Sequence, residues 1–421
     1  MKIAVIGSGV SGLVAALRMA EQHDVTLFEA DARLGGHANT VDAPDGDQRV
    51  AVDTGFLVCN QNTYPNFLSL MQELGVPLAE SDMSFSVRSD RRDFEYSGRD
   101  LGALYVQQRH LFSLRFHRMV WDILRFYREG RELLTSQADL PLYAWLEQRG
   151  FSPQFLEDHL NPMIRAVWSA DKHAAHAFPA RFLVQFFHNH GFLTADAQPP
   201  WLTISGGSRT YVDAIARRFN GKILLNARVS GITRRHGVHG HDVFVETPVG
   251  SERFDHAIIA CHADQALGML KDPSRLEQEL LSAFPYQPNE AVLHSDARMM
   301  PTSRRAWASW NVHLDDEGTP GACVTYWLNS LQPLPTKTDF FVTLNRSHAI
   351  DSEKVIQRFD YSHPVFTVDG IALQSRHSEL INHRSTSYCG AYWRNGFHED
   401  GVVSAMRVVA QLQGNVLTRA A

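Results

Sequence analysis

The feature that most constrains this chain is the stretch AVIGSGVSGLVAA at residues 4–16. An apolar run suited to a strand leads into Gly7, Gly9 and Gly12, spaced as G-x-G-x-x-G, and a helix of small residues follows. In such a unit the first glycine permits a tight turn, the second lets a pyrophosphate approach the backbone, and the third lets the helix pack against the strand. The free N–H groups of the first helical turn, where Ser11 lies, favour phosphate groups. The stretch predicts a dinucleotide site, and at this point NAD and FAD both fit.

The segment after the second expected strand favours a cofactor longer than NAD. That strand brings Glu29 to its end, 17 residues after Gly12. A carboxylate at this place accepts hydrogen bonds from the ribose hydroxyls and repels the 2′-phosphate of NADP. A second glycine pair, Gly35–Gly36, follows directly, with Arg33 before it. Because glycines let the backbone approach a pyrophosphate and an arginine adds a charge-assisted contact, the segment indicates an extended cofactor that lies across the sheet.

Composition excludes several classes of protein. The chain has 421 residues, 44% of them hydrophobic, which suits two or three domains with sizeable cores. Its formal net charge of -6 argues against a nucleic-acid partner. The first strand begins at Lys2 and no apolar run is long enough to cross a bilayer, so we expect no signal peptide and a cytoplasmic protein.

Cysteine and histidine spacing gives no metal site. The four cysteines form no C-x-x-C pair, so we expect reduced, structural thiols. The closest histidines bring no carboxylate at ligand spacing, so we expect them to be solvated loop residues. They are His188 with His190, and the group of His236, His239 and His241.

Five further stretches extend the pattern to the middle and the end of the chain. They are VDTGFLVCN (52–60), WLTISGGSRTYVDAIA (201–216), LLNARVSGI (224–232), FDHAIIACHADQAL (254–267) and YCGAYWRNGFHEDGVVSA (388–405). With the glycine motif, Glu29 and R-x-G-G, they resemble the superfamily of FAD-dependent amine oxidases, phytoene desaturases and protoporphyrinogen oxidases. The resemblance implies FAD as the cofactor and an oxidoreductase as the activity.

The resemblance also implies which residues contact FAD, with a backbone contact to the adenine at Val229. Those residues are Gly7, Gly9, Ser11, Gly12, Glu29, Ala30, Arg33, Gly35, Gly36, His37, Thr54, Gly55, Phe56, Val229, Ala260, Gly390, Gly396, Phe397, His398 and Glu399. The acidic residue that the superfamily often has shortly after the penultimate glycine is absent, since Ala391 and Tyr392 follow Gly390.

A narrower resemblance suggests a substrate. GGHANT, VLHSD, TYWLNSLQ and YSHPVF are similar to bacterial FAD-dependent oxidoreductases encoded beside cyclopropane-fatty-acyl-phospholipid synthases. This implies a lipid-like substrate, with hydride transfer from a modified phospholipid acyl chain to flavin N5, and a lipid methyltransferase as partner. The electron acceptor, oxygen or a quinone, stays open. The alternatives are a flavin-dependent double-bond isomerase, an amine oxidase, and a non-catalytic FAD-bound partner of a lipid methyltransferase.

The expected fold class is α/β with two domains. A Rossmann-like FAD-binding domain is built from 1–75, 200–275 and 376–421. An α+β substrate domain comprises 76–199, which has a helical pattern, and 276–375, whose β-branched and aromatic runs predict a mostly antiparallel sheet under covering helices. Ligands favour such an interface between domains.

Four aromatic residues of the expected sheet have two interpretations. They either line a cavity for a long apolar substrate or fill the space between sheet and helices. They are Trp307, Trp310, Tyr326 and Trp327.

Residues 104–134 predict an amphipathic helix rich in arginine. One face carries apolar residues at steps of three and four, namely Phe112, Phe116, Met119, Ile123 and Phe126. Basic residues outnumber acidic ones along the segment. This composition is typical of a helix on the surface of an anionic membrane, here its inner face, and equally of a domain helix with its apolar side in the core.

His294 is the candidate catalytic residue. By the resemblance, NEAVLHSD falls where amine oxidases carry a strand lysine that holds a water near flavin N5, and Phe397 stands where they carry a tyrosine of the aromatic substrate cage. An imidazole at residue 294 could hold that water or take a proton from the substrate. A polar strand residue without a catalytic role is the alternative.

Overall fold

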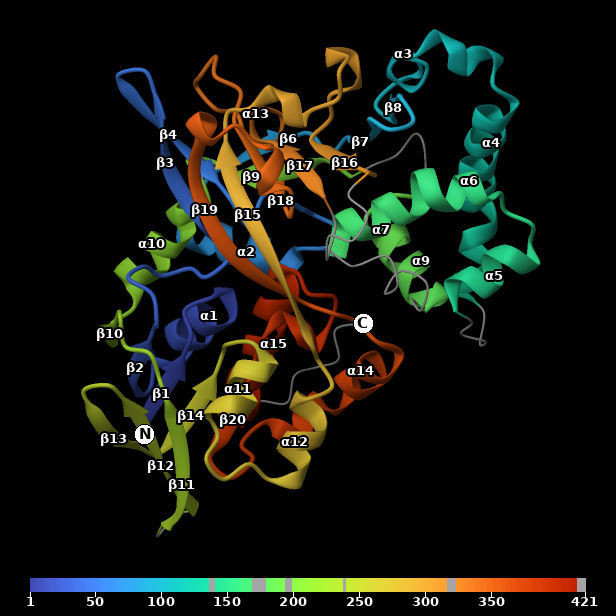
Figure 1. The fold of residues 1–421 in the computed structure, drawn as a ribbon. Helices are drawn as coiled ribbons and strands as arrows, with labels where there is room; N and C mark the ends of the chain where they lie inside the picture. The colour runs from blue at the N-terminus through green and yellow to red at the C-terminus, as the bar shows by residue number, and fades with distance from the viewer. Residues whose placement is uncertain (136–140, 169–178, 194–198, 238–239, 316–322, 415–421) are drawn as a thin grey trace.

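The computed structural model describes residues 1–135, 141–168, 179–193, 199–237, 240–315 and 323–414. The largest parts of the molecule are two sheets and a helical layer (Figure 1). A five-stranded sheet lies at one end, a seven-stranded sheet at the other, and the helices of residues 101–189 lie beside the second sheet. This arrangement confirms the expected α/β fold class.

The five-stranded sheet is parallel throughout and has the strand order β10-β2-β1-β14-β20. Its strands are β1 (Lys2–Ile6), β2 (Asp24–Phe28), β10 (Lys222–Leu224), β14 (His256–Ile259) and β20 (Thr386–Tyr388). Successive side chains of β1 pack into different cores, because side chains along a strand point alternately to the two faces of the sheet. Ile3 and Val5 pack toward the helices, whereas Ala4 and Ile6 pack toward the opposite face.

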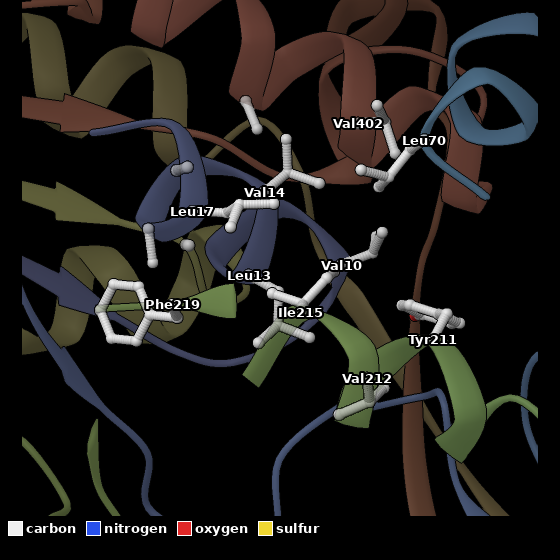
Figure 2. Close-up of a cluster of buried hydrophobic side chains, with 14 of the residues drawn as sticks. Val10, Leu13, Val14, Leu17, Leu70, Tyr211, Val212, Ile215, Phe219 and Val402 are labelled. Atoms are coloured by element: carbon white, nitrogen blue, oxygen red, sulfur yellow. The ribbon is translucent and has the colours of Figure 1, made fainter. Parts of the chain in front are cut away.

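Helices cover one face of this sheet and a small antiparallel sheet covers the other. Figure 2 shows apolar side chains of α1, α10, α2 and α15 meeting in one cluster. These helices are α1 (Val10–Met19), α2 (Pro65–Leu74), α10 (Arg209–Arg218) and α15 (His398–Leu412). The opposite cover consists of β11 (Gly231–Gly237), β12 (Gly240–Thr247) and β13 (Gly250–Phe254). Phe28 meets Phe254 edge to face across this second core, with ring centroids 5.8 Å apart.

The seven-stranded sheet has the order β19-β15-β18-β17-β16-β7-β8 and is antiparallel except between β16 and β7. Its strands are β7 (Phe85–Ser89), β8 (Phe94–Ser97), β15 (Tyr286–His294), β16 (Trp310–His313), β17 (Val324–Trp327), β18 (Phe341–Leu344) and β19 (Val355–Pro364). The helical expectation for 76–199 is therefore wrong at its beginning, where β6 (Leu78–Ser81), β7 and β8 form. These runs are short, and pairing with distant strands decides their conformation.

Short strands join the two large sheets. The hairpin of β3 (Thr40–Asp45) and β4 (Gln48–Asp53) follows the second glycine pair. A three-stranded sheet has β9 (Trp201–Ile204) between β5 (Cys59–Asn60) and β6. Helices α11 (Ala263–Met269), α12 (Arg275–Leu281), α13 (Leu328–Leu331) and α14 (Val368–Leu373) complete these regions.

The helical layer has its own aromatic core. Its helices are α3 (Leu101–Leu104), α4 (Leu114–Glu129), α5 (Leu142–Gln148), α6 (Pro153–Phe155), α7 (Asn161–Trp168) and α9 (Ala180–Asn189). The expected apolar face of α4 packs into this core through Phe116, Met119 and Phe126, with Ile123 partly buried against it. Phe112 does not join that face, because it precedes the helix and is 88% exposed.

Among the described residues, no helix combines the length and apolar composition needed to cross a bilayer.

Candidate functional site

A cavity of about 1290 Å³ lies between the five-stranded and the seven-stranded sheets. The glycine turn after β1, the residues after β2 and β14, and much of β19 all contribute to its lining. Of the residues that the resemblance assigns to FAD, all but Gly12 and Glu399 line it. Segments far apart in the sequence thus meet around one space.

The three glycines of the first turn have different surroundings. Gly7 has φ +98°, a conformation that favours glycine. A Cβ on Gly12 would lie 1.8 Å from the carbonyl oxygen of Gly7, so this position serves helix–strand packing and not the cavity. At Gly9 a Cβ would meet nothing within 4 Å. Gly9 therefore leaves its backbone open to a group in the cavity, as a bound pyrophosphate requires.

Glu29 directly follows β2 at the cavity wall. Its Oε2 accepts hydrogen bonds from the Ser8 N–H at 2.9 Å and the Ser8 hydroxyl at 2.5 Å, and its Oε1 accepts from the Asp31 N–H at 2.9 Å. These bonds hold the carboxylate at the carboxyl end of the parallel sheet. Val229 and Ala260 line the same cavity. The position suits a carboxylate that receives ribose hydroxyls.

The second glycine pair lies against the first turn. Arg33 donates to the carbonyl oxygens of Leu34, Gly36 and Ala38, so its guanidinium holds the loop. Arg33 therefore has a structural role that the sequence spacing did not indicate. Its charge-assisted contact with a phosphate stays a prediction.

His37 brings a polar atom without a partner to the cavity. Its Nε2 is buried and has no hydrogen-bond partner among the described residues. Its ring stacks on Tyr361 and lies near His363, with centroids 5.0 and 5.3 Å apart. Burial, followed by electrostatic interactions with the His363 and His262 rings, holds the pKa of His37 well below its usual value. The free Nε2 and the open backbone at Gly9 fit an anionic cofactor phosphate, so the residues present suit FAD.

The closing segment contributes stacked rings. His398 stacks on Phe56 with centroids 3.8 Å apart, and its Nε2 hydrogen-bonds the Tyr211 hydroxyl at 3.1 Å. Burial lowers the pKa of His398 to about 3, so the ring is neutral. Gly396 has φ +93°, and Phe397 follows it into the cavity.

Glu399 lies outside the cavity lining. Its carboxylate accepts from the Asn66 N–H and side-chain amide at 3.1 and 2.6 Å, and from the Phe67 N–H at 2.8 Å. These are the first N–H groups of α2, which an anion stabilises. The structure therefore places Glu399 at the contact between α15 and α2, and the contact with the flavin that the resemblance implies stays a prediction.

The structure does not bring His294 to the cavity. Its side chain is fully buried, its Nε2 bonds the Thr343 hydroxyl at 2.7 Å, and its Nδ1 accepts from the Asp296 N–H at 3.0 Å. Burial lowers the His294 pKa to about 4. Ala291 and Leu293 of β15 pack in the same core as the cavity-lining residues Tyr326 and Leu344, whereas Val292, between them, packs in a different core. His294 is on the other side of its strand, so its position corrects the catalytic prediction.

Aromatic and aliphatic side chains form the part of the lining that we call the apolar wall. Its members are Leu57, Val58, Phe186, Phe192, Trp201, Trp310, Tyr326 and Leu344. Trp310 meets Tyr326 edge to face at 5.0 Å, and Phe186 stacks on Phe397 at 5.2 Å. Trp307 and Trp327 pack on each other outside the lining. Of the four aromatic residues singled out in the sequence, two line the cavity and two fill the core.

His190 is the polar group within this wall. It follows α9, is 6% exposed and stacks on Phe186 with centroids 3.8 Å apart. Its Nδ1 lies 2.8 Å from the carbonyl oxygen of Phe186, which can only accept, so Nδ1 carries the hydrogen and Nε2 keeps its lone pair. Burial lowers the His190 pKa to about 4, which keeps the ring neutral.

Sequence reasoning placed His190 in a solvated loop, and that expectation is wrong. Its neighbour His188 is exposed, as expected. The signal that could have found His190 is its place in the run FFHNHGF, between aromatic residues of an apolar helix and a glycine turn. Of the other histidines in question, His236 and His241 face each other across a hairpin, and His239 lies outside the described residues.

Comparison with known proteins agrees with this geometry. A family model of flavin containing amine oxidoreductases matches residues 10–298. The CLA-producing fatty acid isomerase from P. acnes is 15% identical over 97% of this chain and 98% of that chain, with a TM-score of 0.66. Cyclohexylamine oxidase from Brevibacterium oxydans IH-35A is 15% identical over 98% of this chain and 99% of that chain, with a TM-score of 0.65. At these identities the two structures show a shared fold.

One curated relative matches a short stretch of the sequence. The 4,4'-diapophytoene desaturase of Staphylococcus aureus (strain bovine RF122 / ET3-1) is 60% identical over 40 residues. Those residues are 9% of this chain and 8% of that relative.

Proposed function

This chain belongs to the flavin-containing amine oxidoreductase family, and on that premise we propose that it oxidises a fatty acyl chain, that of a modified phospholipid. It is an FAD-dependent oxidoreductase. When bound, FAD accepts the hydride that a substrate carbon loses. The proposal names the class of substrate to which this carbon belongs and the protein group that assists its oxidation.

The apolar wall is the observation that carries the proposal. An acyl chain has no polar group to pair, and each methylene that it buries against such a wall contributes about 0.8 kcal/mol. Trp201, Trp310 and Phe192 offer flat faces to a long flexible chain. A wall of this kind suits a lipid tail better than a short polar amine.

His190 supplies the group that takes a proton. Nε2 keeps its lone pair and has no hydrogen-bond partner shown among the described residues, and the ring stays neutral because of its lowered pKa. When one carbon of the chain loses a hydride, Nε2 accepts the proton from the next carbon, and a carbon–carbon double bond results. The two electrons leave the protein to oxygen or a quinone.

Two positions argue against an ordinary amine oxidase. Phe397 stands at the place of the cage tyrosine and lacks its hydroxyl. His294 replaces the strand lysine and points away from the cavity. Neither of the two groups that the resemblance assigns to amine oxidation is therefore present at the site.

Anaerobic flavin reduction tests the substrate. The purified, FAD-loaded protein is mixed with vesicles whose phospholipids carry methyl-branched, cyclopropanated or unsaturated acyl chains, and flavin absorbance is followed. We expect at least one of these lipids to bleach the flavin and saturated lipid to leave it oxidised. Bleaching by a small amine, with none from any lipid, would overturn the proposal.

A double-bond isomerase is the second candidate, favoured by the shared fold with a fatty acid isomerase. In that reaction the hydride returns to the chain and no electron acceptor is consumed. Product formation without oxygen or quinone consumption would select it over the desaturase.

A further inference from the structure

The exposed apolar side chains of this protein concentrate in one short segment. Ten large hydrophobic residues are exposed among the described residues, and six of them fall between residues 101 and 124. These six, which we call the docking face, are Leu101 (77% exposed), Leu111 (51%), Phe112 (88%), Leu114 (86%), Trp121 (55%) and Leu124 (51%). The other four are scattered over the chain, as single exposed apolar residues usually are.

Helix α4 is apolar on two sides. Phe116, Met119 and Phe126 point into the helical core. Leu114, Trp121 and Leu124 lie on the opposite side, seven and three residues apart, which places them on one stripe of a helix. Packing within the domain explains only the inner side. The outer stripe exposes apolar surface that a protein interior does not need.

Charge distinguishes this segment from the rest of the chain. Residues 101–131 contain six arginines and two acidic residues, in a chain whose net charge is -6. Both acids are engaged: Asp122 is buried against Arg118 and Arg125, and Glu129 pairs with Arg125 and Arg128. Arg115, which is exposed, has no ion-pair partner in the part of the chain that the structure describes. The segment that carries the docking face thus has more basic than acidic side chains.

We propose that the docking face binds the surface of an anionic phospholipid membrane. Phe112 and Leu114 project almost fully at the turn before α4, and such projections enter a deformable lipid layer more easily than they fit a rigid protein surface. Trp121 suits the interfacial zone, and arginines attract anionic head groups while their stems lie along apolar material. Figure 1 places α3 and α4 at the outer edge of the molecule, away from the five-stranded sheet. The face is separate from the cavity lining, so this inference and the acyl-chain proposal can fail independently.

The structure also decides which arginines can be tested. Arg118 and Arg125 hold the buried carboxylate of Asp122, so reversing their charge would disturb the fold. Arg115 and Arg128 are exposed and leave Asp122 untouched. The charge variant is therefore Arg115→Glu/Arg128→Glu, and the apolar variant is Phe112→Ser/Leu114→Ser.

Vesicle co-sedimentation of the FAD-loaded protein measures the interaction. The vesicles contain phosphatidylglycerol and phosphatidylcholine, or phosphatidylcholine alone. We expect binding to the anionic vesicles that weakens with salt, and at least about tenfold weaker binding by each variant. Arg217→Glu/Arg275→Glu, on exposed arginines elsewhere, and Val249→Ser, on a residue 97% exposed, should bind like the wild type.

Several results would overturn the proposal. One is equal binding of the wild type to both vesicle types, and another is unchanged binding by both face variants. A third is that the wild type self-associates in light scattering and Phe112→Ser/Leu114→Ser does not. The last result would assign the face to a second copy of the chain. Retained flavin absorbance and an unchanged unfolding midpoint exclude misfolding as the cause of weaker binding.

Discussion

At His190, one backbone carbonyl decides which ring nitrogen can accept a proton. The carbonyl oxygen of Phe186 fixes the hydrogen on Nδ1, and Nε2 is then the only basic atom of the ring. The aromatic stack with Phe186 holds the ring in its orientation. Because burial, and not a charged partner, lowers the pKa, the ring is a neutral base over the physiological range.

The His190→Phe variant should keep FAD and lose turnover. Phenylalanine preserves the stacking and the volume but removes Nε2, so we expect turnover to fall by about 100-fold or more. The measurement is flavin reduction by a lipid substrate under single-turnover conditions. His188→Phe, two residues earlier and exposed, is the control and should match the wild type. Partial recovery of His190→Ala by added imidazole would identify proton transfer, whereas turnover within a few-fold of wild type in His190→Phe would exclude it.

At the scale of elements, the contact between α15 and α2 depends on one carboxylate. Glu399 stands in the first turn of α15 and accepts three hydrogen bonds from Asn66 and Phe67 at the start of α2. Pro65 begins α2, and no side chain of its own segment caps it. The Glu399 carboxylate, which belongs to another helix, therefore accepts the hydrogen bonds that an N-cap side chain would otherwise accept.

We expect Glu399→Gln to lower the free energy of unfolding by about 1 kcal/mol without changing the flavin spectrum. The amide keeps the shape but removes the charge that favours the amino end of α2. Urea unfolding at neutral pH gives the stability, and absorbance of the bound flavin reports the site. Glu279→Gln, a surface carboxylate on α12, is the control. A shifted flavin spectrum with unchanged stability would instead place Glu399 at the cofactor.

Elements built on local patterns could be predicted from the sequence, and those decided by distant pairing could not. The glycine turn, Glu29 and the inner face of α4 follow from short-range spacing, which fixes their geometry. Strands β7 and β8 form because they extend a sheet whose other strands lie 200 residues later. The catalytic prediction for His294 is wrong for a related reason. A strand directs alternate side chains to opposite sides of its sheet, and the sequence alone does not say which side faces a cavity.

At the scale of the whole molecule, buried neutral histidines make the fold sensitive to acid. Among the described residues, burial strongly lowers the pKa of nine histidines. Burial lowers the pKa to about 4 in His110, His159, His190, His256, His294 and His363, to about 3 in His377 and His398, and well below its usual value in His37. In the unfolded chain each has a pKa of about 6.5. The unfolded state therefore binds more protons than the folded state between these values, and stability falls as the pH falls.

This difference predicts a steep loss of stability between pH 6.5 and 4. At pH 5.5 each such histidine should cost about 1 kcal/mol relative to pH 7.5, so the nine together are comparable with the whole stability of an ordinary domain. Asp53 and Asp400, whose pKa burial raises to about 6, act in the opposite direction but are only two. Urea midpoints at pH 7.5, 6.5 and 5.5 measure the slope. His256→Gln should reduce this slope by the contribution of about one proton, because the His256 ring is buried against Ser387. His188→Gln, at an exposed residue, should leave the slope unchanged. Midpoints that stay constant down to pH 5.5 would mean that these rings are protonated inside the fold, and would also remove the neutral base from His190.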